Sequence, residues 1–178
     1  MGSYIVKNEL IFIENKTATA SYLMEQKLFY ENKIRTRACG ILIKNDQILL
    51  IEHFINGKAF FAPPGGGVEF GESLQDALIR EFLEETGLLI LSSKFLFITE
   101  FIKPPLHAIE TFYRIKSSDG ELIKGIDPEL PGLIRGVKWF SMKEIKQIKT
   151  NEIHHIFQYC NNLRDIFALS GYIPYPTI

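Results

Sequence analysis

Three glutamates within five residues, just downstream of a glycine run, constrain this chain more than any other part of its sequence. Glu81, Glu84 and Glu85 stand at i, i+3 and i+4, so a helix would place all three on one face. Like charges at this spacing repel one another, and the cluster invites a cation. The glycine run covers residues 65–67, and residues 66–88 read GGVEFGESLQDALIREFLEETGL. Glycines beside a carboxylate-bearing helix predict a site for a metal ion and a phosphate group.

The helix that carries these glutamates has recognisable ends. Ser73 is a favourable N-cap, Asp76 suits the first turn, and Gly87 fits the position that follows the last turn. At about 100° per residue, Glu81 and Glu85 border the apolar stripe formed by Leu74, Leu78 and Phe82. The acidic patch is therefore expected to point toward the protein.

Two interpretations of the patch compete. The simpler one is a solvated acidic face, paired with Arg80 and lysines. Burial favours a metal site, because a partly buried carboxylate must be paired, protonated or metal-bound. Oxygen ligands alone select a hard cation such as Mg²⁺, which shares its coordination shell with substrate phosphates. The histidines show no zinc spacing, and we expect the pair His154-His155 to lie on the surface or half-buried on a last helix.

The composition bounds the class of protein. At 178 residues the chain has about the length of one domain, and 46% of its residues are hydrophobic. A net charge of −1 gives no electrostatic reason to expect a nucleic acid or a membrane surface as partner. The apolar runs are too short to span a bilayer, and no secretory signal is visible. Cys39 and Cys160 are expected as buried thiols, which fits a cytoplasmic location.

The remaining pattern predicts a mixed α/β (α+β) sandwich. Residues 5–13 and 17–23 have the pattern of a β hairpin, and residues 22–30 could be strand or short helix. Residues 60–62 are a short apolar segment before the glycine loop. Around this loop we expect strands at 34–43, 48–53, 89–100 with a break at Ser92-Ser93, 108–116 and 137–140. Ser141 and Glu144 form a capping box for a short helix. Asn151 is expected to cap a last helix whose apolar positions run from Ile153 to Phe167.

The residues of 66–88 resemble the signature of the Nudix hydrolases, G-x5-E-x7-R-E-U-x-E-E-x-G-U, in which U is a bulky apolar residue. Every fixed position is filled, by Gly66, Glu72, Arg80, Glu81, Phe82, Glu84, Glu85, Gly87 and Leu88. The resemblance divides the chain into an N-terminal extension at 1–33, a Nudix domain at 34–150, and a C-terminal helix and tail at 151–178 that pack on the same domain.

This resemblance implies an α/β/α sandwich with a mixed sheet, and hydrolysis of a nucleoside diphosphate linked to another moiety with Mg²⁺ or Mn²⁺. Carried over to this sequence, it makes Glu81, Glu84, Glu85 and the carbonyl of Gly65 the metal ligands. Arg80 would orient one of these carboxylates. Glu72 would brace the loop against the helix, and Gly66 and Gly87 would serve backbone geometry.

The general base and the substrate stay open. Besides Glu81, the candidates for a base or an extra ligand are Glu110, Glu129 and, more weakly, Glu100. A proline pair at 104–105 followed by Glu110 resembles a feature of ADP-ribose-cleaving members, although their usual Pro-Gly is absent. A nucleotide sugar and a nucleoside triphosphate are the other substrate classes. A non-catalytic nucleotide-binding module is the alternative to an enzyme, and the N-terminal hairpin could form a homodimer.

Overall fold

The computed structural model describes residues 33–55, 57–104, 106–125 and 132–176. The expected N-terminal hairpin, Pro105 and Glu129 lie outside the described residues. The chain divides into two compact units, 1–34 with 102–107, and 35–101 with 108–178. The described part of the first unit consists of Lys33, the first residue of β1, and the adjoining ends of β6 and β7.

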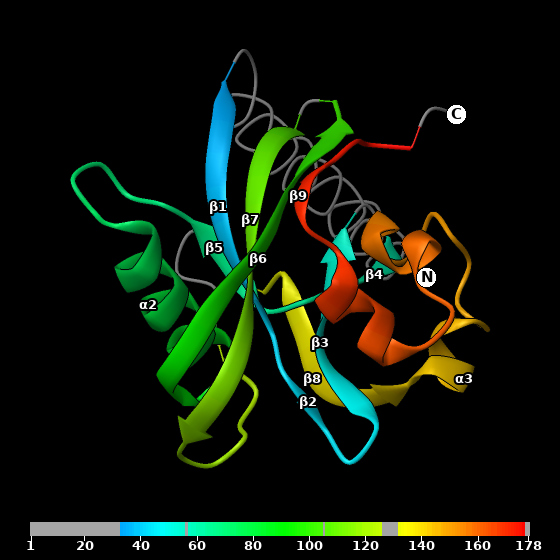
Figure 1. Cartoon of the computed structure of the whole chain (residues 1–178), viewed down its shortest axis with the longest axis horizontal. Helices are drawn as coiled ribbons and strands as arrows, with labels where there is room; N and C mark the ends of the chain where they lie inside the picture. Colours follow the sequence, from blue (N-terminus) through cyan, green and yellow to red (C-terminus); the bar gives the residue numbers. More distant parts are fainter. Residues whose placement is uncertain (1–32, 56, 105, 126–131, 177–178) are drawn as a thin grey trace, which may run out of the picture. The chain divides into compact units, whose positions relative to one another are not determined.

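The described elements follow one another as in Figure 1. They are β1 (Ile34–Ile41), β2 (Ile43–Lys44), β3 (Gln47–Ile55), β4 (Lys58–Ala62), β5 (Gly65–Gly67), α2 (Leu74–Thr86), β6 (Leu89–Lys103), β7 (Leu106–Asp119), β8 (Ile134–Ser141), α3 (Met142–Ile145), the 3-10 helices η1 (His155–Tyr159) and η2 (Leu163–Ala168), and β9 (Gly171–Ile173). All the helices within the described ranges fall short of the length and apolarity that a bilayer span requires.

Two sheets form the centre of the second unit. One has the order β5-β1-β7-β6-β9, and in the other β2, β3 and β4 are joined by β8, which pairs with β3. The first sheet is mixed, because β5 runs antiparallel to β1 whereas β9 runs parallel to β6. The expected single strand at 34–43 is split at Leu42, where the chain passes from one sheet to the other.

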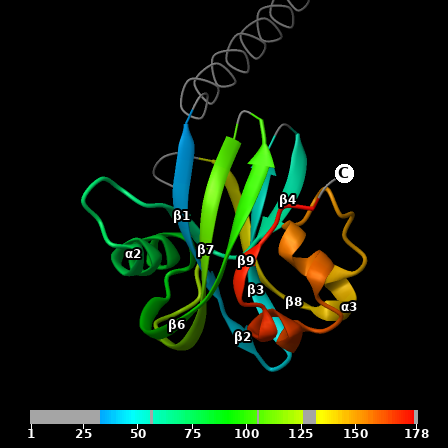
Figure 2. The ribbon, with the colours of Figure 1, turned by 45° about the horizontal axis from the view of Figure 1, so that its top comes forward.

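Alternation along the strands produces the layers. Cys39, Ile41, Ile48 and Leu50 pack in one core cluster, with the apolar residues of α3, η1 and η2. Their neighbours Ala38, Leu42 and Leu49 pack in a second cluster, with Ala77, Leu78 and Phe82 of α2. Successive side chains of a strand point to opposite faces, so both faces need a helical cover. Figures 1 and 2 show α2 on one side of the sheets and α3 with the 3-10 helices on the other, which confirms the predicted α/β/α sandwich.

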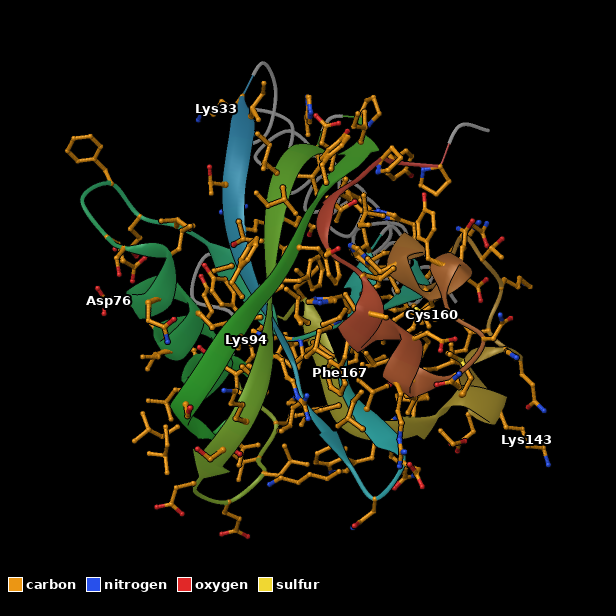
Figure 3. The ribbon with its side chains drawn as sticks, viewed as in Figure 1. Lys33, Asp76, Lys94, Lys143, Cys160 and Phe167 are labelled. Atoms are coloured by element: carbon orange, nitrogen blue, oxygen red, sulfur yellow. The ribbon has the colours of Figure 1, made fainter. Side chains whose placement is uncertain are left out.

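Three further expectations of secondary structure were wrong. The glycine run is the short strand β5 rather than a loop, and β6 is continuous through Ser92-Ser93. The last α-helix is replaced by η1 and η2, which carry Cys160 and Phe167 near their ends (Figure 3).

The backbone explains the loss of that helix. Phe61 donates from its amide to the carbonyl of Glu152 at 2.8 Å and accepts from the amide of His154 at 2.8 Å, so residues 152–154 are bonded to β4. Asn162 then caps η2 through a capping box with Asp165, which ends the preceding turn. The pair His154-His155 is buried, at 2% and 5% exposure, rather than on the surface. Cys39 and Cys160 are free buried thiols, as predicted.

Candidate active site

The helix α2 has the ends that the sequence predicts. Ser73 accepts a hydrogen bond from the amide of Asp76 at 3.1 Å, and Figure 3 shows Asp76 on the side of α2 away from the sheets. Gly87 has a left-handed φ of 73° and donates from its amide to the carbonyl of Leu83 at 2.8 Å. These ends fix the phase of the helix, and Glu81 and Glu85 consequently fall on its buried side.

The strand β5 brings backbone directly against those two glutamates. It pairs with β1 in the register Ala38↔Gly66 and Cys39↔Gly65. A Cβ added at Gly66 would lie 2.2 Å from the carboxylate carbon of Glu81, so only glycine leaves room for this carboxylate. At Gly65, whose φ is 144°, a Cβ would lie 2.2 Å from the carbonyl oxygen of Ala38. The glycines therefore permit close approach between β1, β5 and α2.

The three carboxylates of α2 differ in their environments. Glu85 is 3% exposed and accepts a hydrogen bond from the amide of Gly65 at 2.8 Å. Glu81 is also buried, and this burial raises the pKa of its carboxyl although Arg80 donates to it at 2.9 Å. Glu84 is partly exposed and pairs with the same Arg80 at 3.4 Å.

Arg80 ties the loop before α2 to the helix. Its Nε and Nη2 donate to the two oxygens of Glu72, each at 2.9 Å, in a bidentate pair. Its Nη2 also donates to the carbonyl of Gly67, and its Nη1 donates to Glu81, both at 2.9 Å. The hydrogen bonds from Arg80 lower the pKa of Glu72, which also accepts from the amide of Glu69 at 3.0 Å. One guanidinium thus connects the loop, β5 and a glutamate of α2.

The residues of this site fit a divalent cation of the hard class. The donors are carboxylates and a carbonyl, with no thiolate or imidazole at β5 and the inner face of α2. Burial raises the pKa of Glu81, so its negative charge is incompletely compensated by Arg80. The absence of a Cβ at Gly66 leaves the space that this carboxylate fills. Among the described residues no three acidic, cysteine or histidine side chains already converge on one point. Glu84, the most exposed of the three, would have to turn toward Glu81 and Glu85 to complete a set.

The structure connects Glu110, one of the candidate bases or ligands, to the site through Arg37, and it adds Arg37 and His154, which the sequence did not assign to the site. Arg37 of β1 donates from Nη2 to the carbonyl of Gly65 at 2.5 Å and from Nη1 to Glu110 at 3.3 Å. Glu110, only 1% exposed, also accepts from His154 at 2.7 Å. Burial would raise the pKa of Glu110, but His154 and Arg37 outweigh it, so the pKa lies below its usual value. Thr99 binds His155, the neighbour of His154, at 2.9 Å.

The strand pattern gives a further signal for Glu110, which the sequence already marks as a candidate base or extra ligand. Ala108, Glu110 and Phe112 occupy alternate positions of β7, and all three are buried. A carboxylate in phase with buried apolar residues of a strand must have partners. No comparable signal marks Arg37, since its partners lie 28 and 73 residues away in sequence. The remaining candidate, Glu100, follows Thr99 in β6 and accepts a short hydrogen bond from the hydroxyl of Tyr172 in β9.

Comparisons with known proteins agree with this geometry. The family model described as "NUDIX domain" matches residues 34–159. The chain is 38% identical over 91 residues to the "ADP-ribose pyrophosphatase" of Methanocaldococcus jannaschii, a match that covers 49% of this chain and 54% of that protein. It is 37% identical over 93 residues to the "m7GpppN-mRNA hydrolase NUDT17" of Danio rerio, covering 44% of this chain and 31% of that protein. The match therefore spans about half or less of these relatives.

A solved structure shares the fold. The "MutT NUDIX hydrolase from Burkholderia pseudomallei" superposes with a TM-score of 0.60 and 21% sequence identity. The superposition covers 71% of this chain and 95% of that one. At this identity the likeness concerns the arrangement of strands and helices alone.

Proposed function

This chain belongs to the NUDIX family, and from that premise we propose that it is a Mg²⁺- or Mn²⁺-dependent hydrolase of a nucleoside diphosphate linked to another moiety. The observation that carries the proposal is the pair of buried carboxylates, Glu81 and Glu85, held against the glycine strand β5. Two buried carboxylates side by side on a helix are costly unless a cation compensates them.

Each residue has a role that its contacts support. Glu81, Glu85, Glu84 and the carbonyl of Gly65 would hold the ion. When bound, such an ion neutralises charge on the pyrophosphate oxygens and activates water. Arg80 fixes Glu81 through its hydrogen bond, and Glu72 in turn fixes Arg80.

The general base is proposed among the carboxylates of α2. Glu110 has both oxygens engaged, one by Arg37 and one by His154. A base must reach the water whose proton it takes, and a buried carboxylate with two partners is poorly suited to that. Glu84, the most exposed of the three glutamates, meets the requirement better than Glu81, which is itself buried and held by Arg80.

ADP-ribose is the substrate that we propose to test first. The relative from Methanocaldococcus jannaschii is named for it, whereas the relative from Danio rerio is named for capped mRNA. Both names describe a nucleoside attached to a phosphate chain, which is the chemistry that a divalent-cation site would bind. Hydrolysis of ADP-ribose at its diphosphate gives AMP and ribose 5-phosphate.

The test is a panel of ADP-ribose, NADH, nucleotide sugars, nucleoside triphosphates, dinucleotide polyphosphates and a cap analogue, each with Mg²⁺ or Mn²⁺ and analysed by chromatography. Glu85→Gln removes a charge from the site and should reduce turnover at least ~100-fold. Glu152→Gln is the matched control, because Glu152 is ion-paired on the surface with Lys149. Full turnover by Glu85→Gln would contradict the assignment. Binding of a panel nucleotide without hydrolysis under every metal condition would indicate a binding module instead.

A further inference from the structure

The guanidinium of Arg37 is hydrogen-bonded to the carbonyl of Gly65, which is one of the proposed metal ligands. Its Nη2 lies 2.5 Å from the oxygen of Gly65, and its Nη1 lies 3.3 Å from Oε1 of Glu110. Arg37 therefore connects two groups, one at the edge of the candidate metal site and one in the interior of the sheet. A guanidinium and a divalent cation are both positive, so they repel each other when they share one carbonyl.

The backbone of Gly65 is held in place, so its carbonyl cannot easily change direction. Its amide donates to Glu85 at 2.8 Å, and the strand around it is paired with β1. Its φ of 144° and the 2.2 Å approach of a Cβ to the oxygen of Ala38 show how closely the peptide is enclosed. Since the peptide is held on both sides, the side chain of Arg37 is the mobile partner.

The surroundings of Glu110 favour its ion pair with Arg37. Glu110 is 1% exposed, and His154 donates from Nε2 to its second oxygen at 2.7 Å. The tautomer follows from the other ring nitrogen, because Nδ1 of His154 accepts from the amide of Ile156 at 3.3 Å. The proton of the imidazole is then on Nε2, and Glu110 stays an acceptor for the guanidinium of Arg37.

The negative charges around the site stabilise the guanidinium of Arg37 in its position beside Gly65 and Glu110. Five carboxylates, Glu72, Glu81, Glu84, Glu85 and Glu110, lie with the guanidinium groups of Arg37 and Arg80, and a third guanidinium, that of Arg35, lies against Gly67. In this set negative charge exceeds positive charge, and Arg37 brings a positive charge to the side of Gly65 and Glu85. The same charge opposes the arrival of a second cation there.

We propose that Arg37 is a positioning residue that competes with the divalent cation for the carbonyl of Gly65. In this scheme, which rests on the proposed function, Arg37 holds the carbonyl in the metal-free protein and shifts wholly onto Glu110 in the metal-bound one. Glu110 and His154 act through Arg37, as the anchor that receives it. Arg37 thereby sets the metal affinity and keeps the carboxylates compensated when no ion is present.

Mn²⁺ binding, measured from the free-ion signal in electron paramagnetic resonance, tests this proposal without any substrate. Arg37→Met should bind Mn²⁺ about 5-fold or more tightly than the unmodified chain, the lower end of ordinary coupling between sites. Arg135→Met is the matched control, because it also removes one positive charge, from an exposed arginine that lies over Phe54. Its Mn²⁺ affinity should be unchanged.

Glu110→Gln and the double variant separate positioning from ligation. Glu110→Gln should weaken Mn²⁺ binding in the unmodified chain, because Arg37 is no longer retained away from Gly65. In the Arg37→Met background the same change should have no effect. Equal weakening in both backgrounds would show that Glu110 is itself a ligand and would overturn the proposal, as would an unchanged or weaker affinity in Arg37→Met.

A Mg²⁺ titration of the isotope-labelled, unmodified chain covers the case in which a variant does not fold. The guanidinium resonances of Arg37 and the amide resonance of Gly66 should shift over the same range of Mg²⁺ concentration. Guanidinium resonances of Arg37 that stay fixed at saturation would overturn the proposal while leaving the proposed function intact. If the unmodified chain binds neither ion, the proposed function fails and the competition fails with it.

Discussion

Gly66→Ala should separate the catalytic geometry of this protein from its stability. The added Cβ would lie 2.2 Å from the carboxylate carbon and from Oε2 of Glu81, whereas ordinary contacts begin at 3.4 Å. The carboxylate must therefore retreat by about 1.2 Å, and a misplacement of about 1 Å can cost ~100-fold in rate. At about 1.36 kcal/mol per tenfold change, this corresponds to about 2.7 kcal/mol of activation free energy.

The fold should survive the same substitution. Gly66 does not have a left-handed φ, and its strand pairs regularly with Ala38. The atom that the Cβ meets belongs to the end of a side chain, which can rotate, rather than to backbone. We expect the midpoint of thermal unfolding to fall by only a few degrees, roughly what 1 kcal/mol produces in a domain of this size.

The assay compares kcat/KM for the best panel substrate, the Kd for Mn²⁺ and thermal unfolding in the same preparation. Gly136→Ala is the control, because its Cβ would meet its nearest atom, Oε2 of Glu52, at an ordinary 3.5 Å. Normal kinetics and normal Mn²⁺ affinity in Gly66→Ala would refute the view that the glycine strand positions Glu81. Loss of the fold in Gly66→Ala would refute the view that the side chain of Glu81 moves to admit the new Cβ while the backbone stays in place.

Two further predictions concern stability. Burial and the charge of Arg37 lower the pKa of His53 from 6.5 to about 3, so between these pH values only the unfolded chain takes up the proton. The free energy of unfolding therefore falls as pH drops below 6.5, by about 1.4 kcal/mol per pH unit for this group. In urea unfolding between pH 7 and 5, the free energy of unfolding of His53→Gln should fall less with pH than that of the unmodified chain. An identical fall would contradict the assignment. Thr86→Val should cost about 1–3 kcal/mol, since the buried hydroxyl of Thr86 donates to the carbonyl of Phe82 at 2.5 Å and accepts from the amide of Leu88 at 3.1 Å. Thr86→Ser keeps both bonds and should lose less in the same urea experiment, and equal losses would rule out the hydrogen bonds as the cause.

Local signals in the sequence predicted the local structure around the site. Ser73 and Gly87 bound α2, and Ser141 with Glu144 forms the expected capping box of α3. These features succeed because a cap involves groups only three or four residues apart, which a short stretch of sequence contains in full. The spacing of Glu81 and Glu85 likewise placed both on the buried side of the helix.

Local periodicity failed where backbone pairing from another part of the chain overrode it. Residues 153–167 have helical spacing, yet Phe61 of β4 binds the backbone on both sides of Ile153. A backbone group bonded to a strand is not available to a helical turn, so the segment begins as a bridge and continues as 3-10 turns. The glycine run became a strand for a similar reason, since β1 pairs with it.

The sequence by itself determined the carboxylates and glycines of the candidate site, because the spacing of Glu81, Glu84 and Glu85 and the glycines before them are properties of one continuous segment. Only the tertiary structure decided which distant residues lie near the negative charges of that segment. Arg37, Glu110 and His154 lie on three distant segments, and they meet because the pairing of the strands and the bridge to β4 bring those segments together. Burial makes their charges interact strongly, and burial is fixed by the packing of the whole domain rather than by any residue's neighbours in sequence.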